Sequence, residues 1–179
     1  MKNCFQFKDL SVLGHGVSVM HKARKLVNKD ISGFVLPDWL KDNLEYIIQT
    51  AHDWKIIKRY TIWHDCGKPF CRTVDSEGKQ HFDGHARKSQ EVFDSIIDNK
   101  IVSNLIANDM VLHTAKSDEL NSFQFSKADW ATLILVSFAE LHANADMFGG
   151  TESVSFKIKY KQLDKRGKQI FNSILIHRV

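Results

Sequence analysis

The sequence predicts an all-α domain that carries one small β-hairpin. Hydrophobic residues recur at helical spacing over long stretches, and only two prolines, Pro37 and Pro69, interrupt the chain. One stretch, residues 70–83, is typical instead of two short strands around a turn at residues 75–78, in which a glycine comes late. These observations place a single hairpin within an otherwise helical chain.

Length and composition favour one globular domain. The 179 residues contain no internal repeat or linker, and 43% hydrophobic with 26% charged residues is ordinary for such a domain. We expect one domain over residues 1–179, with a core of about residues 13–150 and a basic helix or tail over residues 151–179. The basic residues near the C-terminus form either a solvated helix face or a surface that follows phosphates.

Cysteine usage and hydropathy predict a cytoplasmic protein. Three irregularly spaced cysteines do not suggest a disulfide framework, which favours a reducing compartment. No apolar run reaches the roughly 18 residues that a membrane span needs, so no membrane partner is expected. The net charge of +4 suits an anionic substrate such as a phosphate ester.

Five stretches are predicted to be helical from their apolar spacing. The second of them forms two helices or one kinked helix that starts at Pro37. Ser126 is a plausible N-cap for the last and most apolar one, and Gly149-Gly150 stops it. The five stretches are residues 16–28, 37–63, 84–98, 101–114 and 126–148.

Two His-Asp pairs occur close together, and their contexts differ. Neighbouring side chains on a continuing helix point about 100° apart, so a pair can bind one ion only where the backbone leaves helical geometry. His64-Asp65 meets this condition, because Cys66-Gly67 follows at once and Pro69 is expected to stop the helix. His52-Asp53 lies in a charge-rich helical stretch and is interpreted as two surface residues at a helix bend. The sequence therefore favours His64-Asp65 as the metal site.

Further ligands have to come from other elements. His15 stands at a helix start between two glycines, which allow a close approach of backbone and metal. Asp146 ends the long apolar helix among alanines. Alone, the first is typical of a capping histidine and the second of a helix-end aspartate. Together with His64 and Asp65 they offer two imidazoles and two carboxylates, a set suited to Mn, Fe, Co, Mg or Zn.

These residues resemble the HD-domain superfamily of metal-dependent phosphohydrolases. The motif "HDCGKP", the hairpin, and then "GKQHFDGHARKSQEVF" are most similar to the HD domain of some bacterial tRNA nucleotidyltransferases. The resemblance spans about residues 13–150 and implies an HD-domain helical bundle. It also implies that His15, His64, Asp65 and Asp146 bind the metal. No nucleotidyltransferase domain is recognised here, so the role of those enzymes in tRNA processing is not carried over.

The resemblance also implies a second set of histidines. His85, after the hairpin, and His113, after the next helix, would bind a second metal or the substrate phosphate. The alternatives are a helix-capping histidine at the first position and a core histidine at the second. One metal ion and two metal ions are both open.

Several polar side chains are candidates for contact with the substrate. Lys68 follows the His-Asp pair by three residues and can neutralise a phosphate oxygen in the transition state, so Asp65 and Lys68 are the expected catalytic residues. Asp65 would orient the attacking water or bridge two metals. The expected substrate contacts are Lys68, Arg72, Arg87, Lys88, Ser89 and His142.

The expected reaction is hydrolysis of a phosphate ester by metal-activated water, and the resemblance implies that the substrate is a phosphate mono- or diester of a nucleotide, or a cyclic phosphate. A nuclease-like phosphodiesterase that acts on cyclic or single-stranded oligonucleotides is an alternative, with the basic C-terminal segment as its docking surface. A non-catalytic metal-binding sensor is a further alternative. The sequence leaves the oligomeric state open.

Overall fold

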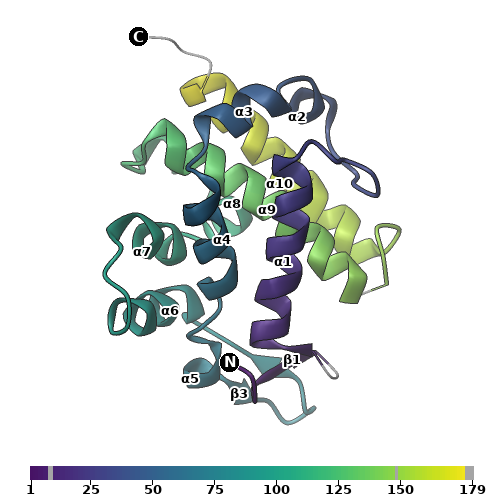
Figure 1. The fold of residues 1–179 in the computed structure, drawn as a ribbon. Helices are drawn as coiled ribbons and strands as arrows, with labels where there is room; N and C mark the ends of the chain where they lie inside the picture. The colour runs from purple at the N-terminus through teal and green to yellow at the C-terminus, as the bar shows by residue number, and fades with distance from the viewer. Residues whose placement is uncertain (8–9, 148, 176–179) are drawn as a thin grey trace. The chain divides into compact units, whose positions relative to one another are not determined.

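The chain is mostly helical in a computed structural model that describes residues 1–7, 10–147 and 149–175. Two small antiparallel sheets of two strands each accompany the helices (Figure 1). The predicted all-α class is therefore confirmed at the level of secondary structure.

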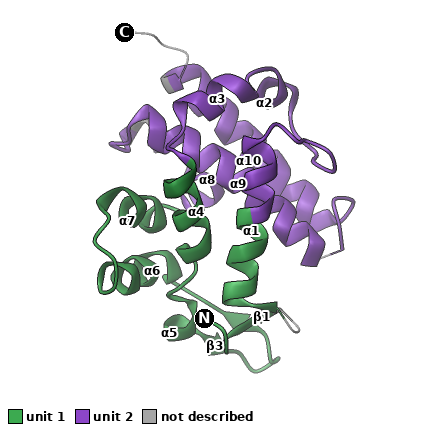
Figure 2. Cartoon of the chain, in the orientation of Figure 1, with its two compact units in different colours: residues 1–20, 54–109 green, residues 21–53, 110–179 purple. Residues whose placement is uncertain are grey.

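The chain forms two compact units, each built from two separate stretches of sequence (Figure 2). Unit 1 comprises residues 1–20 and 54–109, and unit 2 comprises residues 21–53 and 110–179. The expectation of a single domain stays a prediction.

Unit 1 contains both sheets and the helices around the His64-Asp65 motif. Helix α6 packs against α5 and α7, and α7 packs against α4. The elements of unit 1 are β1 (Phe5–Phe7), β2 (Leu10–Ser11), the first turns of α1 (Val12–Val27), α4 (Trp54–Trp63), α5 (Lys68–Cys71), β3 (Thr73–Val74), β4 (Gln80–His81), α6 (His85–Asp94) and α7 (Lys100–Ala107).

The predicted hairpin is present as β3 and β4, which pair antiparallel in the register Thr73 with His81. The Asp75 carboxylate accepts a backbone hydrogen bond from Lys79 (2.9 Å) and closes the turn, and Gly78 takes a φ of 80° there. A second antiparallel pair of strands, β1 with β2, was not predicted. Its two strands are three and two residues long, too short for a period-two pattern to stand out.

Unit 2 is built around α9, a helix whose middle part is buried on every face. Residues 130–139 are all buried, as expected for a helix enclosed by its neighbours. Helices α3, α8 and α10 pack against it. The elements of unit 2 are the end of α1, α2 (Asp38–Asp42), α3 (Leu44–Thr50), α8 (Val111–Thr114), the 3₁₀-helix η1 (Leu120–Ser122), α9 (Lys127–Met147), α10 (Val154–Ile170) and the π-helix η2 (Phe171–Leu175).

The ends of α9 and the nature of the C-terminal segment follow from local chemistry. Ser126 and Asp129 form a reciprocal cap, in which Asp129 N donates to Ser126 Oγ (3.1 Å) and Ser126 N donates to the Asp129 carboxylate (3.0 Å). Gly149 and Gly150 follow with φ of 93° and 81°, so both predicted boundaries are confirmed. The predicted basic segment, residues 151–179, contains helix α10, with Phe156 among its buried residues, and then η2, while residues 176–179 lie outside the described part of the chain.

Two predicted helices are divided more finely than expected. Residues 37–63 form α2, α3 and α4, with breaks at Asn43 and at residues 51–53. The Asn43 side chain donates to Trp39 O (2.7 Å), and this bond satisfies a carbonyl where α2 ends. Residues 101–114 likewise form α7 and α8, with a break after Ala107.

Candidate functional site

The His64-Asp65 pair lies where the chain leaves α4. The helix ends at Trp63, and His64, Asp65, Cys66 and Gly67 form the turn to α5. The expectation that the backbone leaves the helix at this pair is confirmed. The expectation that Pro69 stops the helix is wrong: it lies in the first turn of α5, where its missing N–H costs nothing.

The turn is held tightly against the start of α6. A Cβ on Gly67 would lie 2.3 Å from Ser89 N and 2.5 Å from Lys88 C, so only glycine fits there. Gly67 N donates to Ser89 Oγ (2.8 Å), and the Cys66 thiol donates to Ser89 O (3.2 Å). Burial raises the pKa of the Cys66 thiol to about 11, so this cysteine is a poor nucleophile near neutral pH.

A second glycine brings His15 to the same place. A Cβ on Gly16 would lie 2.8 Å from Ile62 O, so the backbones of α1 and α4 touch at this point in unit 1. His15 is the preceding residue and is fully buried. Gly16 was predicted to permit a close approach of backbone and metal, and in the structure it permits a close approach of the α1 and α4 backbones.

Three predicted ligands converge in unit 1. Asp65 Oδ2 lies 3.3 Å from His64 Nε2 and 3.8 Å from His15 Nε2. The ligand atoms of these three residues all lie within 4.8 Å of one another, and all three residues are buried. A fourth predicted residue, His85, places its Nε2 3.5 Å from Asp65 Oδ1. We call these four residues the His-Asp cluster.

Backbone carbonyls fix the ring orientation of two histidines in the His-Asp cluster. The Nδ1 of His64 lies 2.8 Å from Thr61 O, and the Nδ1 of His85 lies 2.9 Å from Phe82 O. A carbonyl oxygen only accepts, so both Nδ1 atoms carry a proton. In the neutral ring the Nε2 lone pair then faces Asp65, which is the tautomer that metal-binding histidines adopt.

Asp65 is ionised within this buried environment. Burial raises the pKa of its carboxyl group, but the ammonium of Lys68, together with His64 and His15 in their protonated form, outweighs burial, and the pKa lies well below its ordinary value. Lys68 Nζ donates to Asp65 Oδ2 at 2.5 Å and lies 5.5 Å from the centre of the Phe82 ring. Contact of Lys68 with a phosphate stays a prediction.

The donor set of the His-Asp cluster fits a divalent cation. A carboxylate and an imidazole lone pair repel unless a proton or a cation lies between them. Metal–ligand bonds of about 2.1 Å at angles near 90–110° separate two ligand atoms by about 3.0–3.4 Å. The Nε2 of His64 meets this spacing from Asp65, and His85 and His15 exceed it by only a few tenths of an ångström.

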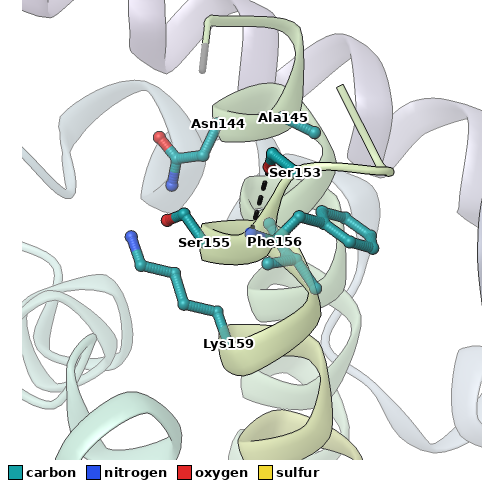
Figure 3. A pocket seen from close by; sticks show the side chains of 7 residues that line it. Asn144, Ala145, Ser153, Ser155, Phe156 and Lys159 are labelled. Carbon is teal, nitrogen blue, oxygen red and sulfur yellow. Dashed lines mark hydrogen bonds between the residues drawn. The ribbon is translucent and has the colours of Figure 1, made fainter. Parts of the chain in front are cut away.

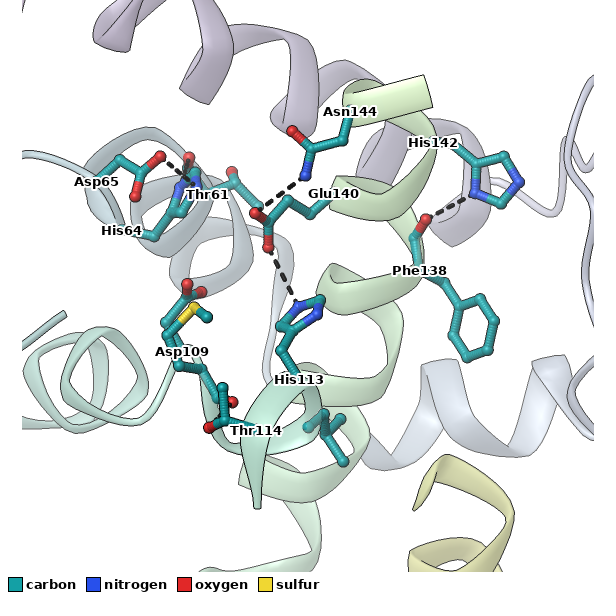
Figure 4. A network of polar contacts seen from close by, with 12 residues as sticks. Thr61, His64, Asp65, Asp109, His113, Thr114, Phe138, Glu140, His142 and Asn144 are labelled. Carbon is teal, nitrogen blue, oxygen red and sulfur yellow. Dashed lines mark hydrogen bonds and ion pairs between the residues drawn. The ribbon is translucent and has the colours of Figure 1, made fainter. Parts of the chain in front are cut away.

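The predicted ligand His113 lies in unit 2, beside an acid that the sequence analysis did not single out. His113 Nε2 is 3.4 Å from Glu140 Oε2, and Asn144 Nδ2 donates to Glu140 Oε1 (3.4 Å; Figure 4). These three residues border a hollow of about 270 Å³ that Arg166 and Lys159 also line. Arg166 is engaged in capping α8, since its Nε donates to Ala115 O (2.7 Å).

Asp146, the fourth predicted ligand, also lies in unit 2. Its side chain is 61% exposed and pairs with Lys22 at 2.9 Å. Its role as a metal ligand stays a prediction. Within unit 2, the carboxylate that neighbours a predicted metal-binding histidine is that of Glu140, six residues earlier on α9.

His142 uses both ring nitrogens within unit 2. Val35 N donates to its Nε2 (2.9 Å), so Nδ1 carries the proton and donates to Phe138 O (2.8 Å; Figure 4). Burial lowers the pKa of His142, and the ring is neutral at pH 7. A substrate contact for His142 stays a prediction.

The remaining predicted contacts differ in exposure. Ser89 is buried and positions the turn that carries the His-Asp pair. The Arg87 side chain is 87% exposed and pairs with Glu91, as does Lys88. Arg72 directly precedes β3 and is exposed. Their contacts with substrate stay predictions.

The first His-Asp pair has a partner that its local sequence does not reveal. His52 lies in the connection between α3 and α4, and its Nε2 is 2.9 Å from Asp129 Oδ1. Burial raises the pKa of Asp129, but hydrogen bonds from Ser126 and His52 outweigh burial and lower the pKa. The pair lies at the break between α3 and α4, which agrees with the interpretation of a helix bend. The His52 side chain is only 17% exposed, however, and it links this connection to the start of α9.

Sequence reasoning missed one buried acid in unit 1. Asp109 follows α7, and its Oδ1 accepts a hydrogen bond from the Tyr60 hydroxyl (2.5 Å). One of its carboxylate oxygens lies within 4.8 Å of a ring nitrogen of His64. Tyr60 is 49 positions from Asp109 in the sequence, so only the fold reveals their hydrogen bond.

A smaller hollow in unit 2 lies where α9 connects to α10 (Figure 3). Its volume is about 10 Å³, which leaves room for at most one water molecule. The Ser153 side chain there caps α10 by accepting from Phe156 N (3.2 Å). This hollow is too small for a substrate.

Comparisons with known proteins returned no match to a family model, to a curated protein or to a solved structure. Within residues 1–7, 10–147 and 149–175, no helix combines the length and the apolar character needed to cross a membrane.

Proposed function

We propose that this chain is a metal-dependent phosphohydrolase that cleaves a phosphate ester of a nucleotide. The observation that carries the proposal is the convergence of His15, His64 and Asp65 in one buried cluster, with His85 beside it. The motif that places these residues resembles the HD-domain superfamily, and we propose membership of that superfamily on the same grounds.

The residues of the His-Asp cluster have distinct parts in the proposed reaction. A divalent cation held there would polarise the phosphoryl oxygen and lower the pKa of a bound water toward about 7. Asp65 is ionised and accepts hydrogen bonds, so it can orient that water. Lys68 neutralises negative charge on the phosphate.

The most exposed member of the His-Asp cluster is His85. This side chain is 16% exposed and that of Lys68 is 10% exposed, whereas His15 and His64 are buried. His85 is also the first residue of α6, a ten-residue helix whose free N–H groups favour an anion. A phosphate that approaches from this side meets the helix end, His85 and Lys68 together.

Hydrolysis by the purified, metal-loaded protein tests the proposal. The screen covers mononucleotides, 2′,3′-cyclic and 3′,5′-cyclic nucleotides, dinucleotides, and short RNA and DNA, each with Mn²⁺, Co²⁺, Mg²⁺, Fe²⁺ and Zn²⁺. We expect turnover of at least one substrate, lost in His64→Gln and retained in the matched variant His52→Gln. Absence of turnover on every substrate with every metal would contradict the proposal and favour a metal-binding sensor.

A further inference from the structure

The outward face of α4 carries a cluster of positive charge that the proposed hydrolysis does not use. Lys55, Lys58 and Arg59 line a hollow of about 240 Å³ together with Ile62 and Trp63. Among residues 1–7, 10–147 and 149–175, no acidic side chain pairs with any of the three cations. We call these five residues the α4 basic face.

The position of this face follows from helical spacing. Its members stand at 55, 58, 59, 62 and 63, which is the i, i+3, i+4, i+7, i+8 pattern of one helix side. The opposite side of α4 carries the buried residues Ile57, Tyr60 and Thr61. Thr61 O is the carbonyl that orients His64. One helix therefore carries both the support of the His-Asp cluster and an unpaired basic surface.

The last residue of the α4 basic face is Trp63, which directly precedes His64 in the chain. The Trp63 ring meets the buried Phe93 ring edge to face, with centres 5.9 Å apart and planes at 75°. This contact holds the indole in place while part of it stays exposed. A supported, partly exposed aromatic ring beside cations is a platform on which a nucleic-acid base can stack.

We infer that the α4 basic face binds single-stranded nucleic acid. Lys55, Lys58 and Arg59 contact successive phosphates, and Trp63 stacks on a base. The face extends about 12 Å along the helix at 1.5 Å per residue, which is enough for two or three nucleotides. A ligand that offered only negative charge would leave Trp63 and Ile62 unused, and a membrane surface favours apolar side chains that protrude more fully than these.

This inference goes beyond the proposed hydrolysis and does not depend on it. A strand can bind in the presence of a chelator, when no metal-dependent cleavage occurs. Binding and hydrolysis are therefore measured separately, and either can fail while the other holds.

The test is fluorescence anisotropy with a fluorescein-labelled 15-nucleotide RNA of mixed sequence, with EDTA, at several salt concentrations. The variant Lys55→Gln/Lys58→Gln/Arg59→Gln removes the three cations. Lys161→Gln/Lys165→Gln/Lys168→Gln makes the same change of charge on exposed positions of α10. Each cation that contacts a single-stranded phosphate contributes about 0.7 to the slope of log affinity against log salt. We expect the α4 variant to lose at least tenfold in affinity and to reduce the slope by about 2, with less than threefold loss in the α10 variant.

A second variant tests the stacking contact. Trp63→Leu keeps all charges, so affinity should fall about tenfold without a change in the salt slope, and circular dichroism verifies that the variant is folded. Equal binding by the wild type and the α4 triple variant would overturn the inference, as would equal loss in both triple variants. Equal competition by inorganic polyphosphate, combined with full binding by a folded Trp63→Leu, would identify a general polyanion surface instead. Tighter binding to vesicles with phosphatidylserine than to RNA would identify a membrane surface.

Discussion

Removal of the Asp65 carboxylate should destabilise the fold as well as abolish metal binding. The Asp65 and Lys68 side chains are 2% and 10% exposed, and Lys68 Nζ lies 2.5 Å from Oδ2. At an effective dielectric constant of 20, unit charges at that separation attract by about 7 kcal/mol. The cost of removing both groups from water offsets much of this attraction, and the loss of one partner of such a pair costs about 3–5 kcal/mol. We expect the lower end for Asp65→Asn, because the Lys68 ammonium can turn toward solvent.

The assay is urea unfolding at pH 7 with EDTA, so that bound metal contributes nothing to stability. Asp65→Asn should lower the free energy of unfolding by about 3 kcal/mol. Asp65→Asn/Lys68→Met removes both charges and should recover at least half of that loss, while metal binding stays absent. A loss below 1 kcal/mol in the single variant, or no recovery in the double variant, would refute the assignment of a buried ion pair.

Three further predictions concern other parts of the structure. Gly67→Ala should lower the free energy of unfolding by about 2–3 kcal/mol and reduce metal affinity, because the new methyl group meets the α6 backbone. Urea unfolding and metal titration measure the two effects, and a variant with wild-type stability and metal affinity would contradict the close packing of the turn on α6. Burial lowers the pKa of His142, so the unfolded chain binds more protons than the folded chain as pH falls through 6.5, and the free energy of unfolding decreases there. In urea unfolding at several pH values, His142→Gln should flatten this decrease by up to about 1.4 kcal/mol per pH unit. An equally steep decrease in the variant would count against a neutral ring. His52→Gln should retain wild-type metal content and lose about 1 kcal/mol of stability through its contact with Asp129; a variant without metal would show that the wrong pair was chosen.

The sequence predicted the elements that have strong local signals. The apolar spacing of α1 and α9, the Ser126 cap and the glycines at 149–150 are all local features, and the structure has each of them. Helix breaks were harder to predict. At the break at Asn43 the side chain donates a hydrogen bond to the preceding turn, and apolar spacing does not encode such a bond.

The part of the His-Asp cluster that was predicted also has local sequence signals. His64, Asp65 and His15 have glycine-rich contexts that indicate close packing, and the structure brings them together. Asp109 and Glu140 have no such context, because their partners Tyr60 and His113 are 49 and 27 positions away. Long-range contacts between single polar residues leave no pattern in one sequence.

Metal analysis of the purified protein tests the central claim most directly. The protein is dialysed against a chelator, reloaded with Mn²⁺ and measured by mass spectrometry, beside His15→Gln/His64→Gln and His52→Gln. We expect at least one equivalent of metal in the wild type and in His52→Gln, and a loss of at least tenfold in the double variant. A wild-type protein without bound metal, or a folded double variant with undiminished metal, would contradict the assignment of the His-Asp cluster as a metal site.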